Sequence, residues 1–179
     1  MLALLLGIAF WFMQKNPSIP IMLLPDAATT TASVLETKAP ARNVPEGYKE
    51  YHNGTYHLSL FYPDNLTAHE FPEEGGAMTV TFEYLDKKTA SGFQIFIVPF
   101  SGGQITQERF KEDDPSGVMQ NLKNIEVAGA VGASFNSQDK ILGATYEIWF
   151  THGGYLYEAT TFKETQSMLD AAMSSVVFY

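Results

Sequence analysis

The sequence contains no cysteine, and this absence removes a whole set of possible sites. Disulfide bonds, thiolate metal ligands, cysteine nucleophiles and a lipidated cysteine behind a signal peptide are all excluded. Basic residues are also scarce, because 11 lysines and arginines stand against 20 acidic residues and the formal net charge is −9. We therefore expect no nucleic-acid binding, and a cationic partner would be attracted. The same charge would also serve simply to keep a domain soluble.

The sequence also lacks an apolar run as long as the ~20 residues of an ordinary transmembrane helix. Its most apolar stretch, MLALLLGIAFWFM at 1–13, spans roughly 20 Å as a helix. Trp11 and Phe12 stand beside Lys15, as in an interfacial belt. We expect residues 1–15 to anchor the protein in a membrane with its domain outside the cytoplasm, although the position of Lys15 argues for the opposite orientation. The alternatives are a cleaved signal peptide on a secreted protein, and a buried N-terminal helix.

The rest of the chain divides into a linker and a domain. Residues 16–47 are rich in Ala, Thr and Pro and show no apolar period, so they are expected to form an extended, flexible linker. Residues 48–179 contain most of the 13 Phe and 9 Tyr, which suffice for a real core. They also hold eight basic and seventeen acidic residues, so the whole charge excess belongs to this domain.

The apolar pattern of the domain predicts strands, a short helix, further strands and a final helix. Alternation or continuous apolar runs predict strands at 56–62, 78–84, 93–100, 125–127, 131–135, 144–152 and 155–162. A short helix is predicted at 106–112, and a capping box at 161–164 predicts the start of the last helix. This order is typical of an α+β fold with a mostly antiparallel sheet and helices packed on its faces.

The strongest local prediction is a hairpin about Gly153-Gly154, a two-residue turn that tolerates positive φ. With this turn Phe150 faces Tyr157, and the residues between them alternate to the other side of the ribbon. That other side carries apolar residues that suggest an interaction face, which consists of Trp149, Thr151, Leu156 and Thr160. The alternative is that a helix covers it, for which the apolar stripe that begins at Met168 is a candidate.

The sequence shows no catalytic constellation and no cofactor motif. None of the four histidines stands in an HExxH or HxH arrangement. His57 and Ser59 share one face of a predicted strand, which suits a site but is more simply a solvated pair. The acidic run 112–114 with Ser116 indicates either a solvated loop or a weak cation site. We expect no catalytic, metal or cofactor site from these residues.

Three stretches resemble the PsbP-like superfamily: YHLSLFYP at 56–63, GAVGASF at 129–135 and YLYEAT at 155–160. The last is followed by further matching residues, which are Leu169, Met173, Ser174, Ser175 and Phe178. The resemblance spans about residues 51–178 and is greatest to small, uncharacterised bacterial members that are membrane-anchored or secreted. It implies a PsbP-like α/β/α sandwich and a non-catalytic, partner-binding role. It supplies no metal-ligand motif and no site residues for this chain.

Together these features predict a membrane-tethered, extracytoplasmic accessory domain that binds an unidentified protein. A domain that binds a small ligand or cation, and a hydrolase with an unrecognised site, are the alternatives from other functional classes.

Overall fold

The computed structural model describes residues 41–84, 91–102, 104–115, 117–139 and 143–179. The strands in these residues are β1 (Tyr48–Asn53), β2 (Leu58–Pro63), β3 (Thr67–Pro72), β4 (Met78–Glu83), β5 (Gly92–Pro99), β6 (Gln120–Val127), β7 (Ala130–Asp139), β8 (Gly143–His152), β9 (Tyr155–Phe162) and β10 (Val177–Phe178). The helical elements are η1 (Glu74–Gly76), α2 (Gln107–Asp113), η2 (Lys163–Thr165) and α3 (Gln166–Ser174).

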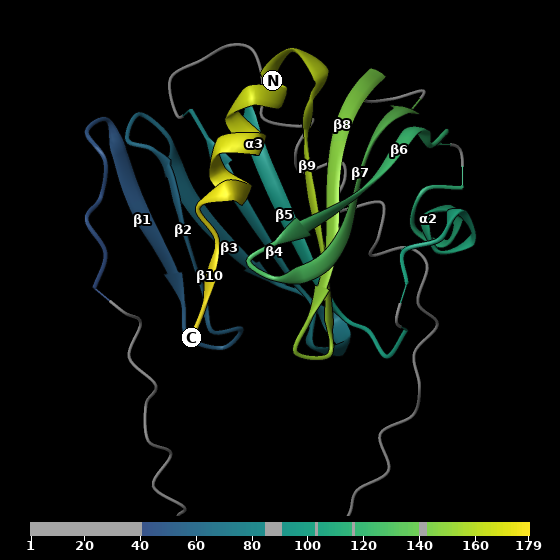
Figure 1. Cartoon of the computed structure of the whole chain (residues 1–179), viewed down its shortest axis with the longest axis horizontal. Helices are drawn as coiled ribbons and strands as arrows, with labels where there is room; N and C mark the ends of the chain where they lie inside the picture. Colours follow the sequence, from purple (N-terminus) through teal and green to yellow (C-terminus); the bar gives the residue numbers. More distant parts are fainter. Residues whose placement is uncertain (1–40, 85–90, 103, 116, 140–142) are drawn as a thin grey trace, which may run out of the picture.

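The strands form two antiparallel sheets, which confirms the predicted α+β class. The larger sheet has seven strands in the order β3-β4-β5-β9-β8-β7-β6, and the smaller one has three in the order β1-β2-β10. Every neighbouring pair in both sheets is antiparallel. In Figure 1 the small sheet and α3 lie on one side of the large sheet, and α2 lies near β6 at its far end.

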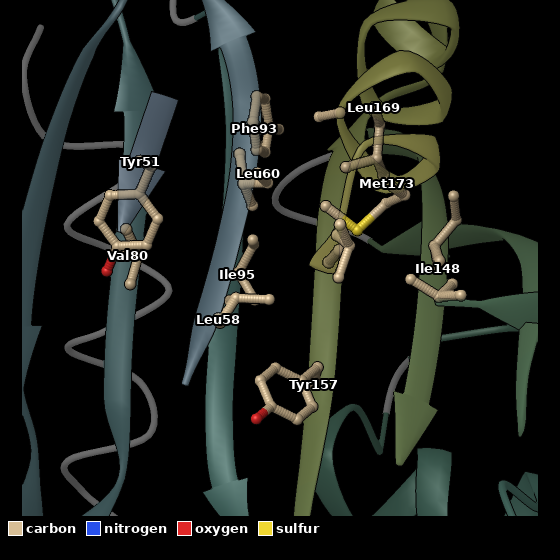
Figure 2. Packing of buried hydrophobic residues seen from close by; sticks show 14 of the residues in the cluster. Tyr51, Leu58, Leu60, Val80, Phe93, Ile95, Ile148, Tyr157, Leu169 and Met173 are labelled. Atoms are coloured by element: carbon tan, nitrogen blue, oxygen red, sulfur yellow. The ribbon is translucent and has the colours of Figure 1, made fainter. Parts of the chain in front are cut away.

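The main core lies between the large sheet and the layer formed by the small sheet and α3. Because the side chains of a strand alternate between its two faces, every second one points toward this core. Figure 2 shows Leu60 of β2 and Leu169 of α3 lying over the large sheet. Aromatic rings fill much of the space: the rings of Phe82 and Phe93 stack with centroids 4.4 Å apart. Burial of such side chains is the main favourable term in folding, at roughly 1.5–3 kcal/mol each.

The hairpin about Gly153-Gly154 is confirmed in its turn and its register. Both glycines have positive φ, 58° and 84°, which two-residue hairpin turns require. Phe150 pairs with Tyr157, as predicted, and their rings stack at 4.8 Å. The side chains of β8 and β9 therefore divide between the main core and the opposite face of the sheet.

The opposite face carries a second, smaller core covered by helix α2. Phe110 of α2 is buried against Phe135 of β7 and Trp149 of β8, with ring centroids 5.2 and 5.7 Å away. Leu156 of β9 completes the cluster and is fully buried. Met168 of α3 packs instead on the main core. The predicted possibility that the Met168 stripe covers the Trp149 face is therefore wrong, because α3 follows β9 onto the other side of the sheet.

The structure corrects two predicted boundaries, and each has a local cause. Strand β2 begins at Leu58 because His57 has a positive φ of 49°, which no strand accommodates. The capping box at 161–164 does not form: Thr161 pairs with residues of both β5 and β8, and its hydroxyl donates to the Gly92 carbonyl at 2.7 Å. Helix α3 consequently begins later, at Gln166. Its N-cap residue is Thr165, whose side chain makes no capping hydrogen bond.

The predicted anchor at 1–15 and residues 16–40 of the predicted linker lie outside the described residues. Arg42 lies within the predicted linker range and contacts the domain. Its guanidinium pairs with Glu50 at 2.7 Å, donates to the Ser175 carbonyl and lies 4.1 Å from the centroid of the Phe61 ring. Contacts with the domain thus extend in front of the predicted start at residue 48. Among the described residues, no helix has the length and apolarity needed to span a bilayer.

Candidate functional site

The predicted interaction residues do lie on one face of the β8–β9 hairpin, but α2 covers part of it. Trp149 and Leu156 are buried in the second core. Thr151 is half-buried at the margin of an open groove, and the half-buried Thr160 donates its hydroxyl to the carboxylate of Glu147 at 2.5 Å. An interaction role for this face stays a prediction, and of its residues only Thr151 borders the groove.

A buried ionic cluster joins α2 to the sheet beside this second core. Arg109 of α2 donates to Glu158 of β9 at 3.3 Å and forms an ion pair with Asp113, one turn later on the same helix. The Arg109 and Asp113 side chains are 15% and 13% exposed, and that of Glu158 is 6% exposed. One guanidinium therefore lies between two largely desolvated carboxyl groups, so that loss of the cation would leave both of them without their shared partner.

The pKa of Glu158 is raised well above its ordinary value. Burial is the largest cause, because it disfavours the charged form, and the carboxyl of Asp113 adds to the rise. The Arg109 guanidinium acts in the opposite direction, and the carboxyl of Glu147 raises the pKa further. Together these effects favour a neutral Glu158 beside the Arg109–Asp113 pair.

Glu147 lies on the same face and is fully enclosed. It accepts hydrogen bonds from the hydroxyls of Thr145 at 2.7 Å and Thr160 at 2.5 Å, and from the indole nitrogen of Trp149 at 3.3 Å. Burial raises the pKa of Glu147 to about 7, although these three donors pull it down, while the charge of Asp114 raises it. The carboxyl group is thus poised to change charge near neutral pH.

Strand alternation places these two acids together. Glu147 pairs with Thr160, and Glu158 pairs with Trp149, so that all four side chains share one face. The sequence predicted the face shared by Trp149 and Thr160 but gave the two glutamates no role. The sequence does contain one sign of a role for them, because each glutamate stands among aromatic and aliphatic residues inside a predicted strand. Because Arg109 of α2 lies 49 positions from Glu158, sequence spacing does not reveal the cluster.

The first turn of α2 is held by its N-cap residue. The hydroxyl of Thr106 accepts a hydrogen bond from the backbone nitrogen of Arg109 at 3.2 Å. We expect Thr106→Ala to lower the free energy of unfolding by about 1 kcal/mol, because it leaves that donor without its cap. Urea unfolding measures the change, and Thr106→Ser, which keeps the hydroxyl, should retain most of the stability. Equal losses in both variants would contradict a capping role.

An open groove of about 710 Å³ lies on this face of the sheet, between the segment that leads into α2 and the β6–β7 hairpin. The register pairs Asn124 with Ala133 and Glu126 with Val131, which places these side chains on the groove side. The residues that matter for its chemistry are Gln104, Ile105, Asn124, Glu126, Val131 and Thr151. They combine amide, carboxylate and hydroxyl groups with aliphatic surface, a mixture suited to recognition of a polar chain with apolar side chains.

Exposed apolar residues gather along the same part of the chain. Val131 is 64% exposed and lines the groove, while Leu122 of β6 is 50% exposed and Val118, just before β6, is 45% exposed. Strand β6 is an edge strand of the seven-stranded sheet, and most of its residues are exposed. An exposed apolar group at a sheet edge is typical of a protein-binding surface.

The other residues singled out in the sequence do not converge on a site. His57 is exposed outside β2, whereas Ser59 is fully buried. In the acidic run, Glu112 and Asp113 are both engaged by Arg109, at 3.5 Å for Glu112. Ser116 lies outside the described residues. Within the part of the chain that the structure describes, no three histidine or acidic side chains are grouped so that they could hold a metal ion.

Comparison with known proteins supports the fold. No protein-family model matches the chain, and no curated protein matches it significantly. Among solved structures, the chain is similar to cyanobacterial PsbP (CyanoP) from Synechocystis sp. PCC 6803, with a TM-score of 0.56 and 15% identity. The match covers 80% of this chain and 99% of that one. At this identity the likeness shows the fold alone, so the PsbP-like fold is confirmed, and kinship with the bacterial membrane-anchored members stays a prediction.

Proposed function

We propose that this protein is a non-catalytic accessory domain that binds a protein partner through the groove and the β6–β7 hairpin. The observation that carries the proposal is Val131, a valine 64% exposed on the margin of a groove at the edge of a sheet. Exposed apolar surface of this kind costs free energy in water, and a partner that covers it recovers that cost. The PsbP-like fold is compatible with this role without requiring it.

The cellular setting of the proposal comes from the sequence. The apolar segment at 1–15 would tether the domain to a membrane, and the part of the predicted linker that precedes Arg42 would let it stand away from the bilayer surface. We place the domain outside the cytoplasm, with a cleaved and secreted form as the alternative. Fractionation of cells and protease accessibility of the domain in intact cells test both parts.

The binding surface can be tested by photo-crosslinking in the native cell. A benzoylphenylalanine placed at position 131 should form a specific adduct, because Val131 projects into the groove. The same probe at Lys163, exposed at the other end of β9, should not form it. When the probe is placed at Leu122 instead, Val131→Asp should abolish the adduct. Adducts of equal yield from positions 131 and 163 would contradict binding at the groove.

A small-molecule ligand is the second candidate, and the groove volume of about 710 Å³ is the observation that favours it. This volume falls within the ~300–1,000 Å³ typical of ligand pockets. A ligand bound there would raise the melting temperature of the purified protein by mass action. In that case no protein adduct would form from position 131 in cells. A screen of a compound library would find compounds that raise the melting temperature of the wild type but not that of Val131→Asp.

A further inference from the structure

Among the described residues that line the groove, the charged one is acidic. Glu126 lines its β6 wall, and Glu108 is exposed three positions after Ile105, at the start of α2. The pKa of Glu108 is lowered by the backbone nitrogen that it accepts from and by the Thr106 hydroxyl, so it stays ionised at neutral pH. A ligand that brings positive charge to this part of the surface is therefore favoured.

The nearby cations do not neutralise this charge on the groove side. Arg109 is engaged by Glu158 and Asp113 beneath α2, and the amine of Lys111 donates to the Gly117 carbonyl. Lys123 lies on β6 and pairs with Ser134, so its side chain is on the face of the hairpin opposite to that of Glu126. A basic partner would therefore encounter no lysine or arginine on the described wall of the groove.

The backbone of β6 supplies the second element of recognition. The first half of the strand contains a register shift between Gln120 and Lys123, and Asn121 has a positive φ of 55°. Bulges of this kind interrupt strand pairing at a sheet edge. Residues 124–127 instead keep a regular register with β7, so their outward N–H and C=O groups are aligned for one further strand.

We propose that residues 124–127 and the adjoining groove bind an extended segment of a partner protein, rich in lysine or arginine, as an added β-strand; this inference rests on the protein-binding function proposed above. An added strand sends alternate side chains to the two faces of the sheet. Those on the groove face lie beside Glu126 of β6. Those on the other face meet Ile125, which is only partly exposed and packs against the main core.

The alternation defines the occupant. A segment in which cationic residues alternate with β-branched apolar residues matches both faces, whereas an acidic segment meets like charge at Glu126. A second copy of this chain is a poor occupant, because each copy carries a formal net charge of −9. Main-chain hydrogen bonds supply affinity in such complexes, while the alternate side chains supply specificity.

The test uses the full-length protein and three fluorescent peptides of about eight residues, the usual length of a strand. The first alternates lysine with valine, the second has the same composition in two blocks, and the third replaces lysine with glutamate. Anisotropy should show binding of the first alone, and binding should weaken with added salt. N-methylation of alternate backbone nitrogens in the first peptide should abolish it, because strand addition needs those donors.

Variants of the protein locate the bound peptide. Glu126→Lys should weaken the alternating peptide by roughly tenfold or more, since like charges then oppose each other. Glu164→Lys makes the same charge change at an exposed site on η2 and should have little effect. Equal binding of the block peptide, or equal losses in both variants, would show unspecific charge attraction and overturn the inference. Self-association through Val131 in sedimentation experiments would overturn it as well.

The two proposals can fail separately. If no peptide binds but the position-131 adduct forms in cells, the protein-binding function stands and the extended basic segment is wrong. If neither the peptide nor the adduct is observed, both proposals fall.

Discussion

Replacing Arg109 with methionine is expected to lower the free energy of unfolding by about 3–5 kcal/mol at pH 8. The substitution keeps a long apolar stem against the second core but removes the only cation between Glu158 and Asp113 in the described cluster. The largely desolvated carboxyl groups of Glu158 and Asp113 would then lose the cation and hydrogen-bond donor that they share. Urea unfolding of wild type and variant measures the change.

The loss should depend on pH, because protonation relieves it. Without the guanidinium the pKa of Glu158 rises further, since the favourable charge that lowered it is gone. Glu158 is then neutral at pH 5 and is driven toward its charged form as the pH rises. We therefore expect a smaller cost at pH 5 than at pH 8. A cost that is equal at both would contradict the uncompensated charge as its cause.

Two further variants separate charge from packing. Glu158→Gln in the Arg109→Met background should recover a large part of the stability at pH 8, because glutamine is neutral without a bound proton, whereas the buried Glu158 must hold one that the unfolded chain releases. Lys111→Met makes the same change at a neighbouring position of α2, where the amine donates to the Gly117 carbonyl. We expect it to cost only about 1 kcal/mol, the usual value of one hydrogen bond. Equal costs at positions 109 and 111 would show that α2 responds to any change of this size.

Local patterns predicted those parts of the fold that local chemistry determines. The Gly153-Gly154 turn fixed the register of β8 and β9, and with it the division of their side chains between two faces. Strand β3 escaped prediction because its sequence, TAHEFP at 67–72, shows little alternation of apolar and polar residues. Its residues are only half-buried or exposed at a sheet edge.

The candidate site depended on contacts that no local pattern contains. Helix α2 was predicted, but not that Phe110 would pack on Trp149 and remove the predicted interaction face from water. The groove likewise joins Ile105, which precedes α2, with Val131 of β7. Its two walls are brought together by the order of strands in the sheet, which follows from packing of the whole domain.

Replacing Glu147 with glutamine is expected to stabilise the protein at pH 8. Burial raises the pKa of Glu147 to about 7, against about 4.5 in the unfolded chain. The unfolded state therefore loses its proton near pH 4.5 and the native state only near pH 7, so wild-type stability falls as the pH rises between these values and is level above them. At about 1.36 kcal/mol per pH unit, the difference amounts to about 3 kcal/mol.

Glutamine is neutral at every pH, and its carbonyl oxygen can still accept from Thr160 and Trp149 while its amide nitrogen donates to the Thr145 hydroxyl, so the variant should lack this decline. We expect similar stability for the two proteins near pH 4, and a gain of up to about 3 kcal/mol for Glu147→Gln at pH 8. Urea unfolding at several pH values measures both curves. Glu164→Gln is the control, because that side chain is exposed and its removal should leave the wild-type decline in place. Parallel curves for wild type and Glu147→Gln would mean that Glu147 keeps its charge in the native state, stabilised by its three hydrogen-bond donors against the cost of burial.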